Sequence, residues 1–419
     1  MKRVYLFNTG CIRRALDTTR VYHYLTKNGW AFTNNISVAQ LIVVSTCGAV
    51  QKTEDLSKIA LKNIAEKMSK DASLIVTGCL PSINPQVLHN IPGVDKSFFV
   101  PTRELDSLDE ILKSEVRMRN IPEANLVTNE IGLLDYVLAY RFFRHSFFLN
   151  IYKKMSSSRI FLKSIILLSR NYNFIRRKIG LPAEGKIVPY YNLVIAEGCA
   201  FNCAFCCIKF ATKKVKSKPI KNIVEEFKRG LSKEYKIFQL VCEDVGCYGI
   251  DIGLSFPELL KQLLSINGNY KLIILDLGGY WLVKYYKELL PLLVANPDKL
   301  REFYVSIQSG SKDILKAMRR PDKIDRVIAT LKDMKNRLPH LIIRTTVIVG
   351  FPGETDEDFE KTIMALREVE FSAVEINKYE DRPGTESSRM DNKIPADVID
   401  RRVKELAMRI PAASASRRA

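Results

Sequence analysis

The chain has 419 residues, of which 47% are hydrophobic, and a formal net charge of +19 from 65 basic and 46 acidic residues. This length predicts two or three domains with sizeable cores. The chain opens MKRVYLFNTGC without an apolar signal segment, and polar residues interrupt its longest apolar runs, so we expect a cytoplasmic protein without a transmembrane segment. The basic excess favours an anionic partner, with nucleic acid as first candidate, or simply a solvated surface.

Residues 1–110 alternate short β-rich runs with helical patterns. The predicted strands are Val4–Phe7, Leu41–Ser45 and Ser73–Thr77, and the predicted helices are about Asp17–Asn28 and Glu54–Ser69. Strands that alternate with helices in this way predict a small parallel α/β domain of the flavodoxin-like kind.

Three cysteines of this domain, Cys11, Cys47 and Cys79, each follow one predicted strand. The carboxyl ends of parallel strands share one edge of the sheet, so we expect the three thiols to converge there. Converging thiolates are typical ligands of a [4Fe–4S] cluster, although three unrelated buried cysteines would give the same sequence pattern.

In residues 111–186 the alternation of strands and helices stops, and we predict that this segment is a connector. Between residues 141 and 180, ten Lys or Arg occur without any Asp or Glu, and Phe and Tyr are interleaved with them. Such a segment can bind phosphates and stack on bases, lie on an anionic membrane surface or bind an acidic peptide. It can equally be a connector whose apolar face packs on the following domain.

Residues 187–395 repeat strand and helix six times. The predicted strands are Tyr190–Ile195, Ile237–Cys242, Lys271–Leu275, Glu302–Ile307, Ile342–Val349 and Ala373–Lys378. The predicted helices include Phe256–Leu264, Trp281–Leu293, Lys323–Arg337 and Asp356–Val369. This repeat predicts an open (β/α)6 partial TIM barrel with its reactive groups at the C-terminal ends of the strands. Residues 396–419 predict a last amphipathic helix, Asp397–Met408, and a disordered tail.

The stretch EGCAFNCAFCC follows the first strand of this barrel and contains Cys199, Cys203 and Cys206. Cysteines with this spacing can bind three irons of a [4Fe–4S] cluster and leave the fourth iron open to a small molecule. Zinc sites usually have four ligands from paired Cys or Cys/His sets, and no His lies nearby. We interpret the remaining cysteines, Cys207, Cys242 and Cys247, as free thiols.

With Phe205 in its aromatic position, this spacing resembles the CxxxCxφC pattern of radical S-adenosylmethionine (SAM) enzymes. A low-potential cluster of this kind can reduce bound SAM to a radical that abstracts hydrogen from an inert carbon, while the protein binds and orients the reactants. Polar residues and glycines at the other strand ends, together with one arginine within the fifth strand, are the candidate SAM contacts: Glu243, Asp244, Gln308, Ser309, Arg344, Gly350 and Gly353.

Most of the chain resembles the radical SAM methylthiotransferases. The matching segments are NTGC at 8–11 with Asp17 following, STCGAV at 45–50, TGCLP at 77–81, EGCAFNCAFCC at 197–207, EDVGCYGID at 243–251, IQSGSKDILKAMRR at 307–320, VGFPGETDEDFEKT at 349–362 and RPGTESSRM at 382–390. The resemblance implies two [4Fe–4S] clusters and SAM as cofactors. It also implies a sulfur source and a low-potential electron donor such as flavodoxin or ferredoxin.

In this family the cluster on Cys199, Cys203 and Cys206 would generate the radical, and that on Cys11, Cys47 and Cys79 would hold or donate the sulfur. Known members modify a tRNA adenosine beside the anticodon or an aspartate of a ribosomal protein. Members of the family normally end with a small β-barrel of the TRAM type, and we do not expect one in this chain. The segment at 141–180 has no counterpart in the family's pattern. We therefore slightly favour a peptide or protein side chain as substrate, with a tRNA adenosine as the alternative.

Two other functions remain open. Cobalamin-dependent radical SAM methylases also have an α/β domain before the barrel, but that domain commonly contains a DxHxxG loop, and none of the four His lies in such a loop. A cluster-bearing protein that binds RNA or senses redox state would need no SAM-binding turn like that at 350–354.

Overall fold

The computed structural model describes residues 2–127 and 190–415. They group into two compact units, one made mainly of residues before 128 and the other of residues from Tyr190 onward. The basic, aromatic segment at 141–180 and most of the predicted connector lie outside the described residues.

The first unit contains a five-stranded sheet in which every strand pair is parallel. Its strands are β1 (Arg3–Asn8), β2 (Ala31–Phe32), β3 (Leu41–Thr46), β4 (Ser73–Gly78) and β5 (Phe98–Pro101), in the order β2-β1-β3-β4-β5. This order is that of flavodoxin-like sheets, so the predicted fold of this unit is confirmed. The sequence did not reveal β2 and β5, which are short edge strands.

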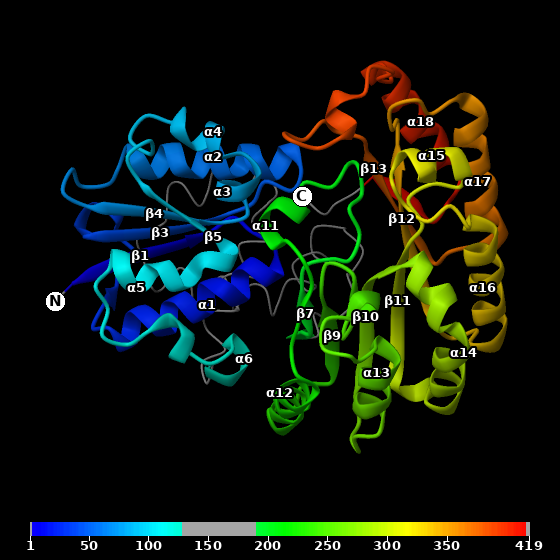
Figure 1. Cartoon of the computed structure of the whole chain (residues 1–419), viewed down its shortest axis with the longest axis horizontal. Helices are drawn as coiled ribbons and strands as arrows, with labels where there is room; N and C mark the ends of the chain where they lie inside the picture. Colours follow the sequence, from blue (N-terminus) through cyan, green and yellow to red (C-terminus); the bar gives the residue numbers. More distant parts are fainter. Residues whose placement is uncertain (1, 128–189, 416–419) are drawn as a thin grey trace, which may run out of the picture. The chain divides into compact units, whose positions relative to one another are not determined.

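Helices cover both faces of this sheet (Figure 1). Successive side chains of a strand point to opposite faces, and both faces carry apolar side chains that pack on helices. Val43 and Ile75 pack on one side with α1 (Ile12–Lys27) and α5 (Leu108–Ile111), whereas Val44 and Val76 pack on the other with helix α2 and its neighbours. The remaining helices of the unit are α2 (Gln51–Ala65), α3 (Leu80–Ile83), α4 (Pro85–His89) and α6 (Ala124–Val127).

The second unit contains a seven-stranded sheet in the order β14-β13-β12-β11-β10-β9-β6, again with every pair parallel. Its strands are β6 (Tyr190–Val194), β9 (Ile237–Val241), β10 (Lys271–Gly278), β11 (Leu300–Ser306), β12 (Ile342–Val349), β13 (Ala373–Lys378) and β14 (Ala413–Ala415). The first six are the predicted strands in chain order, which confirms the parallel radical SAM-type partial barrel.

Helices follow these strands along the outside of the sheet (Figure 1). They are α12 (Ile220–Ser232), α13 (Phe256–Leu264), α14 (Gly279–Ala295), α15 (Lys312–Ala317), α16 (Ile324–Arg337), α17 (Asp356–Val369) and α18 (Ala396–Arg409). One continuous apolar core joins the strands to these helices and includes fully buried Phe238, Phe256 and Phe303.

The expectation of a disordered tail is wrong for Ala413–Ala415. These residues form β14, which pairs in parallel with β13 through Val374 and Ile376. Helix α18 leads the chain back to the edge of the sheet formed by β13. The backbone groups of β13 that face away from β12 can bind another strand there. Within the described residues, each helix is too short or too polar to cross a lipid bilayer.

A buried ion pair fastens the turn after β12 to α18. Arg402 donates to the Glu354 carboxylate at 2.8 Å and to the Glu354 backbone carbonyl at 3.1 Å, and both side chains are almost inaccessible to solvent. Burial raises the pKa of Glu354 to about 7, although Arg402 and the Gly350 N–H oppose that rise. An ion pair in this position is costly to break because either charge alone would stay desolvated.

We expect Arg402→Ala to lower the free energy of unfolding of the second unit by about 3 kcal/mol or more, because it leaves the Glu354 carboxylate buried without its partner. The matched control is Arg401→Ala, which removes an exposed arginine from the same helix and should change stability by less than about 0.5 kcal/mol. Denaturant titration measures both. Equal effects of the two substitutions would contradict the importance of the buried pair.

Candidate functional site

The cysteine loop begins directly after β6, the first strand of the second sheet. A short antiparallel pair, β7 (Ala196–Glu197) with β8 (Lys216–Ser217), closes its base, and α11 (Ile208–Thr212) follows it. Gly198 has a φ of 84°, which favours glycine, and its N–H donates to the Glu243 carboxylate at 2.7 Å. The loop is thus bound to the end of the neighbouring strand β9.

The three thiols of this loop influence one another electrostatically. Burial, the Asp244 carboxylate and the other two thiols raise the pKa of Cys199. Burial and the neighbouring Cys203 raise the pKa of Cys206, although backbone N–H groups of α11 oppose that rise. The Arg320 guanidinium donates to the Cys203 Sγ at 3.6 Å. The structure therefore brings these three thiols close together at one end of the sheet, beside a cationic group.

Two carboxylates follow β9 and have different partners. Glu243 accepts the Gly198 N–H, whereas the Asp244 Oδ1 accepts the N–H groups of Gly246 and Gly278, each at 3.0 Å. Burial raises the pKa of Asp244 from 3.8 to about 6, although Gly278, Arg320 and Gly246 oppose that rise. A Cβ at Gly278 would come 2.5 Å from the Asp244 Oδ2, so only glycine leaves room for this carboxylate.

Gln308 combines two features that are typical of ligand contacts. It has a left-handed backbone with a φ of 68°, which is strained for a residue with a Cβ, and lies just beyond the end of β11. Its buried Oε1 has no hydrogen-bond partner among the described residues. A buried acceptor without a partner is costly, so a donor of a bound molecule would relieve this cost. This observation fits SAM binding at the strand ends.

The structure explains three other candidate contacts by packing. Ser309 is fully buried, and its hydroxyl accepts the Ser311 N–H within its own loop. Gly350 and Gly353 lie in the turn after β12 with φ values of 83° and 84°, and a Cβ at either would come within 2.4 Å of a neighbouring side chain.

Arg344 is the third residue of the eight-residue strand β12, where it pairs with Glu302 at 2.9 Å and lies over the Tyr304 ring. In the strand register it stands opposite Tyr304, two residues before the end of β11 at Ser306. The structure thus shows an ion pair of Arg344 on the sheet, and contact of this residue with SAM stays a prediction.

The extra cysteines are all buried. The Sγ atoms of Cys242 and Cys247 both lie within 4 Å of the Gly198 carbonyl oxygen, to which they donate. Cys247 also donates to the Asp244 carbonyl. Hydrogen bonding to Cys247 and burial hold the pKa of Cys242 well above its usual range.

The second cysteine trio lies at the C-terminal edge of the first sheet, after β1, β3 and β4. Burial and the nearby Cys11 raise the pKa of Cys47, and burial raises that of Cys79 to about 12. Cys11 is exposed, and the positive charges of Arg13 and Arg14 outweigh desolvation and lower its pKa. The three thiols therefore lie close enough to interact electrostatically.

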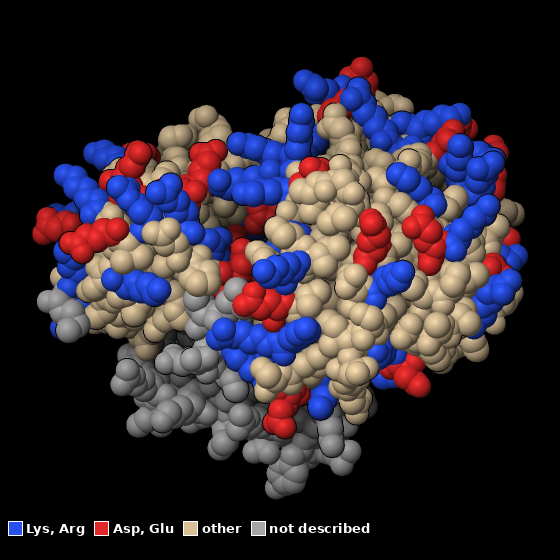
Figure 2. Space-filling view, turned by 60° about the horizontal axis from the view of Figure 1, so that its bottom comes forward, with Lys and Arg blue, Asp and Glu red and all other residues tan. Residues whose placement is uncertain are grey.

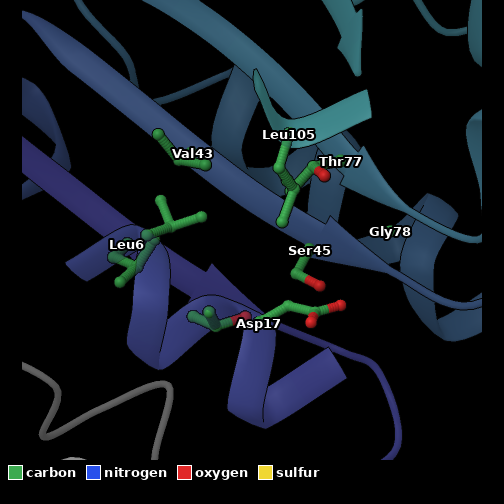
Figure 3. Close-up of a pocket in the computed structure, with 9 residues that line it drawn as sticks. Leu6, Asp17, Val43, Ser45, Thr77, Gly78 and Leu105 are labelled. Carbon is green, nitrogen blue, oxygen red and sulfur yellow. The ribbon is translucent and has the colours of Figure 1, made fainter. Parts of the chain in front are cut away.

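A small cavity lies beside this trio (Figure 3). It has a volume of about 10 Å³, room for roughly one water. Figure 3 shows Asp17 and Ser45 at one end and Leu6 and Val43 at the other. Asp17 pairs with Arg14 at 2.8 Å and accepts from Thr102. Desolvation raises the pKa of Asp17, although Arg14 opposes that rise. The cavity is far too small for a nucleoside, so SAM does not fit there.

The donor chemistry of both trios fits an iron–sulfur cluster better than a single metal ion. Across residues 2–127 and 190–415, no three Cys, His, Asp or Glu side chains are arranged to hold one ion. A [4Fe–4S] cluster takes one thiolate on each iron, so its ligands lie farther apart than those around a single ion.

Comparison with known proteins decides the family. The model of the Radical SAM superfamily matches residues 193–366, and that of the uncharacterized protein family UPF0004 matches residues 3–99. A probable threonylcarbamoyladenosine tRNA methylthiotransferase from Pyrococcus abyssi is 27% identical over 97% of this chain and 83% of its own. The ribosomal protein uS12 methylthiotransferase RimO from Carboxydothermus hydrogenoformans is 28% identical over 96% and 81%. The chain contains a radical SAM domain and is similar along almost its whole length to radical SAM methylthiotransferases. This enzyme is a radical SAM transferase, and its cofactors are SAM and [4Fe–4S] clusters.

A solved structure shares the fold of this methylthiotransferase. The radical SAM methyltransferase TsrM from Kitasatospora setae, solved with cobalamin and a [4Fe–4S] cluster bound, has a TM-score of 0.60 and 12% sequence identity. The match covers 92% of this chain and 77% of TsrM. Identity this low shows a common fold and says nothing of cobalamin in the methylthiotransferase.

Sequence reasoning missed Arg320 and the aromatic side chains around the cysteine loop. Phe201 contacts Tyr280 and Trp281 with ring centroids 5.8 and 5.9 Å apart, and Arg320 lies 6.0 Å from the Phe201 ring. Arg320 ends the segment IQSGSKDILKAMRR, so its position within a family motif was visible. Its contact with a cysteine more than a hundred residues away was not.

We expect the Asp244 carboxylate to make stability depend on pH. The folded protein binds its proton up to about pH 6 and the unfolded chain only up to 3.8, so the free energy of unfolding should fall as pH rises through this window. Asp244→Asn keeps an oxygen for both glycine N–H groups and cannot ionise. The stability of the cluster-free parent relative to this variant should therefore fall by about 2 kcal/mol between pH 4 and 6. A constant difference would contradict the raised pKa.

Proposed function

We propose that this enzyme transfers a methylthio group to an unactivated C–H carbon of a macromolecule, with a tRNA adenosine as first candidate. One observation carries the proposal: each of the two parallel sheets has three interacting thiols at its C-terminal edge. One trio has the spacing of a cluster with an open iron, and the other provides a second cluster for sulfur, as in the relatives' reaction.

The residues of the second unit have separate roles in this proposal. Cys199, Cys203 and Cys206 hold the cluster, which with bound SAM supplies the hydrogen-abstracting chemistry of the superfamily. Glu243 fixes the loop through the Gly198 N–H, and Gln308 offers its unpaired oxygen to SAM.

The charge of the chain favours tRNA among the substrate classes. A net charge of +19 attracts a polyanion, and Figure 2 shows Lys and Arg over much of the face drawn, with Asp and Glu among them. The relative from Pyrococcus abyssi is named for a tRNA nucleoside. A peptide or protein side chain is the second candidate, because a relative of similar identity is named for a ribosomal protein.

The reaction also needs partners that donate electrons and sulfur. A net gain of CH2S replaces one C–H bond by a C–S bond. One SAM would supply the radical that takes the hydrogen atom, and a second SAM would supply the methyl group. A reductant for the cluster and a source of sulfur must also be supplied at each turnover. A flavodoxin or ferredoxin and a sulfide donor fit these needs, and substrates of this kind would place the reaction in the cytoplasm.

The ligand assignment predicts about eight irons per chain after anaerobic reconstitution, because each [4Fe–4S] cluster contributes four. Cys203→Ala should lose about four irons and stop the reductive cleavage of SAM. Cys207→Ala is the matched control, since it removes the adjacent buried thiol and should keep both properties. Iron and sulfide analysis with chromatography of 5′-deoxyadenosine measures this. Four irons in the parent, or cleavage by the Cys203 variant, would refute the assignment.

The substrate proposal predicts a gain of CH2S on an adenosine of tRNA when the reconstituted enzyme acts with SAM, dithionite and sulfide. Mass spectrometry of digested tRNA, and of ribosomal proteins and peptides treated in parallel, measures it. The Cys203→Ala enzyme is the blank. If only a protein side chain gains CH2S, the second candidate substrate is correct. If SAM is cleaved but neither tRNA nor protein gains CH2S, methylthio transfer is rejected.

A further inference from the structure

The backbone around Arg320 is fixed by the way α15 ends. Arg319 has a φ of 53°, and its N–H donates to the Lys316 carbonyl while the Arg320 N–H donates to the Leu315 carbonyl. This pair of bonds is the Schellman arrangement that closes helix C-termini. Arg320 is therefore held at a defined position directly after the helix.

The same helix end also holds the cysteine loop. The Ala204 N–H, next to Cys203, donates to the Met318 carbonyl at 2.9 Å, and the Ala204 carbonyl accepts the Ser387 N–H at 3.0 Å. Ala204 itself is fully buried. The positions of the Cys203 thiol and the Arg320 side chain are consequently set by one rigid turn.

The Arg320 guanidinium spans the gap between this turn and the end of β11. One nitrogen donates to the Cys203 Sγ at 3.6 Å, and the other donates to the Ser306 carbonyl at 3.2 Å. Its planar face lies 6.0 Å from the Phe201 ring, and its charge acts on Asp244. A planar guanidinium can make these contacts at once, which the single ammonium of lysine cannot.

We propose that Arg320 is a positioning residue that sets the reduction potential of the cluster on Cys199, Cys203 and Cys206. A positive charge and an N–H···S bond stabilise the reduced cluster more than the oxidised one, because reduction adds negative charge to the sulfurs. Arg320 thereby raises the potential at which the cluster accepts an electron. This inference rests on the proposed function of the trio.

The test compares Arg320→Gln with Arg319→Gln in the full chain lacking the other trio (Cys11→Ala, Cys47→Ala, Cys79→Ala). Both substitutions remove one positive charge, but Arg319 pairs with Glu386 and is half exposed. Dithionite titration followed by electron paramagnetic resonance measures the potential. Arg320→Gln should weaken the reduced state at least tenfold, a fall of about 59 mV for one electron. Arg319→Gln should change the potential, relative to the parent, by less than about a third of that shift.

Equal potentials for the two glutamine variants, with about four irons in each, would overturn the role of Arg320 and leave the cluster assignment intact. A parent chain without iron would overturn both. If Arg320→Gln cannot hold the cluster, Arg320→Lys decides the matter. It keeps the charge but not both hydrogen bonds, so a smaller fall in potential supports the inference and an unchanged potential rejects it.

Discussion

The parallel direction of the strands is the constraint on which the rest of the structure depends. Because β6, β9 and β11 run the same way, their C-terminal ends bring the cysteine loop, Glu243 with Asp244, and Gln308 to one edge of the second sheet. The same rule places Cys11, Cys47 and Cys79 at one edge of the first sheet. A single antiparallel strand would carry its polar residues to the opposite edge and separate the groups that must act together.

Carboxylates and glycines together shape the loops at this edge. Glu243 accepts the Gly198 N–H, Asp244 accepts those of Gly246 and Gly278, and Glu354 accepts that of Gly350. Glycine allows the close approach, and the carboxylate satisfies backbone donors that would otherwise be buried without partners. Glu243 and Asp244, which the sequence suggests as ligand contacts, therefore hold the loops in place, and their direct contact with SAM stays a prediction.

The sequence predicted most of the fold because buried parallel strands appear as β-rich apolar runs with strong helical patterns between them. Six strands of the second sheet and three of the first were found within a few residues of their observed ends. The edge strands β2, β5 and β14 were missed because strands of two to four residues are too short to show a periodic pattern in the sequence. Arg344 illustrates a different limit: residue type alone gives neither the depth of a side chain along its strand nor its partner, here Glu302.

The site was only partly predictable, and the likeness to TsrM shows why fold cannot supply the rest. Both proteins share a fold over most of this chain, yet TsrM was solved with cobalamin bound and the relatives of this chain are named as methylthiotransferases. Function depends on the side chains that a fold carries, which a shared backbone does not specify. Here three interacting thiols follow β1, β3 and β4, with Arg13 and Arg14 beside Cys11. Thiolates and neighbouring cations favour an anionic sulfur centre at that edge, and a shared backbone carries no such preference.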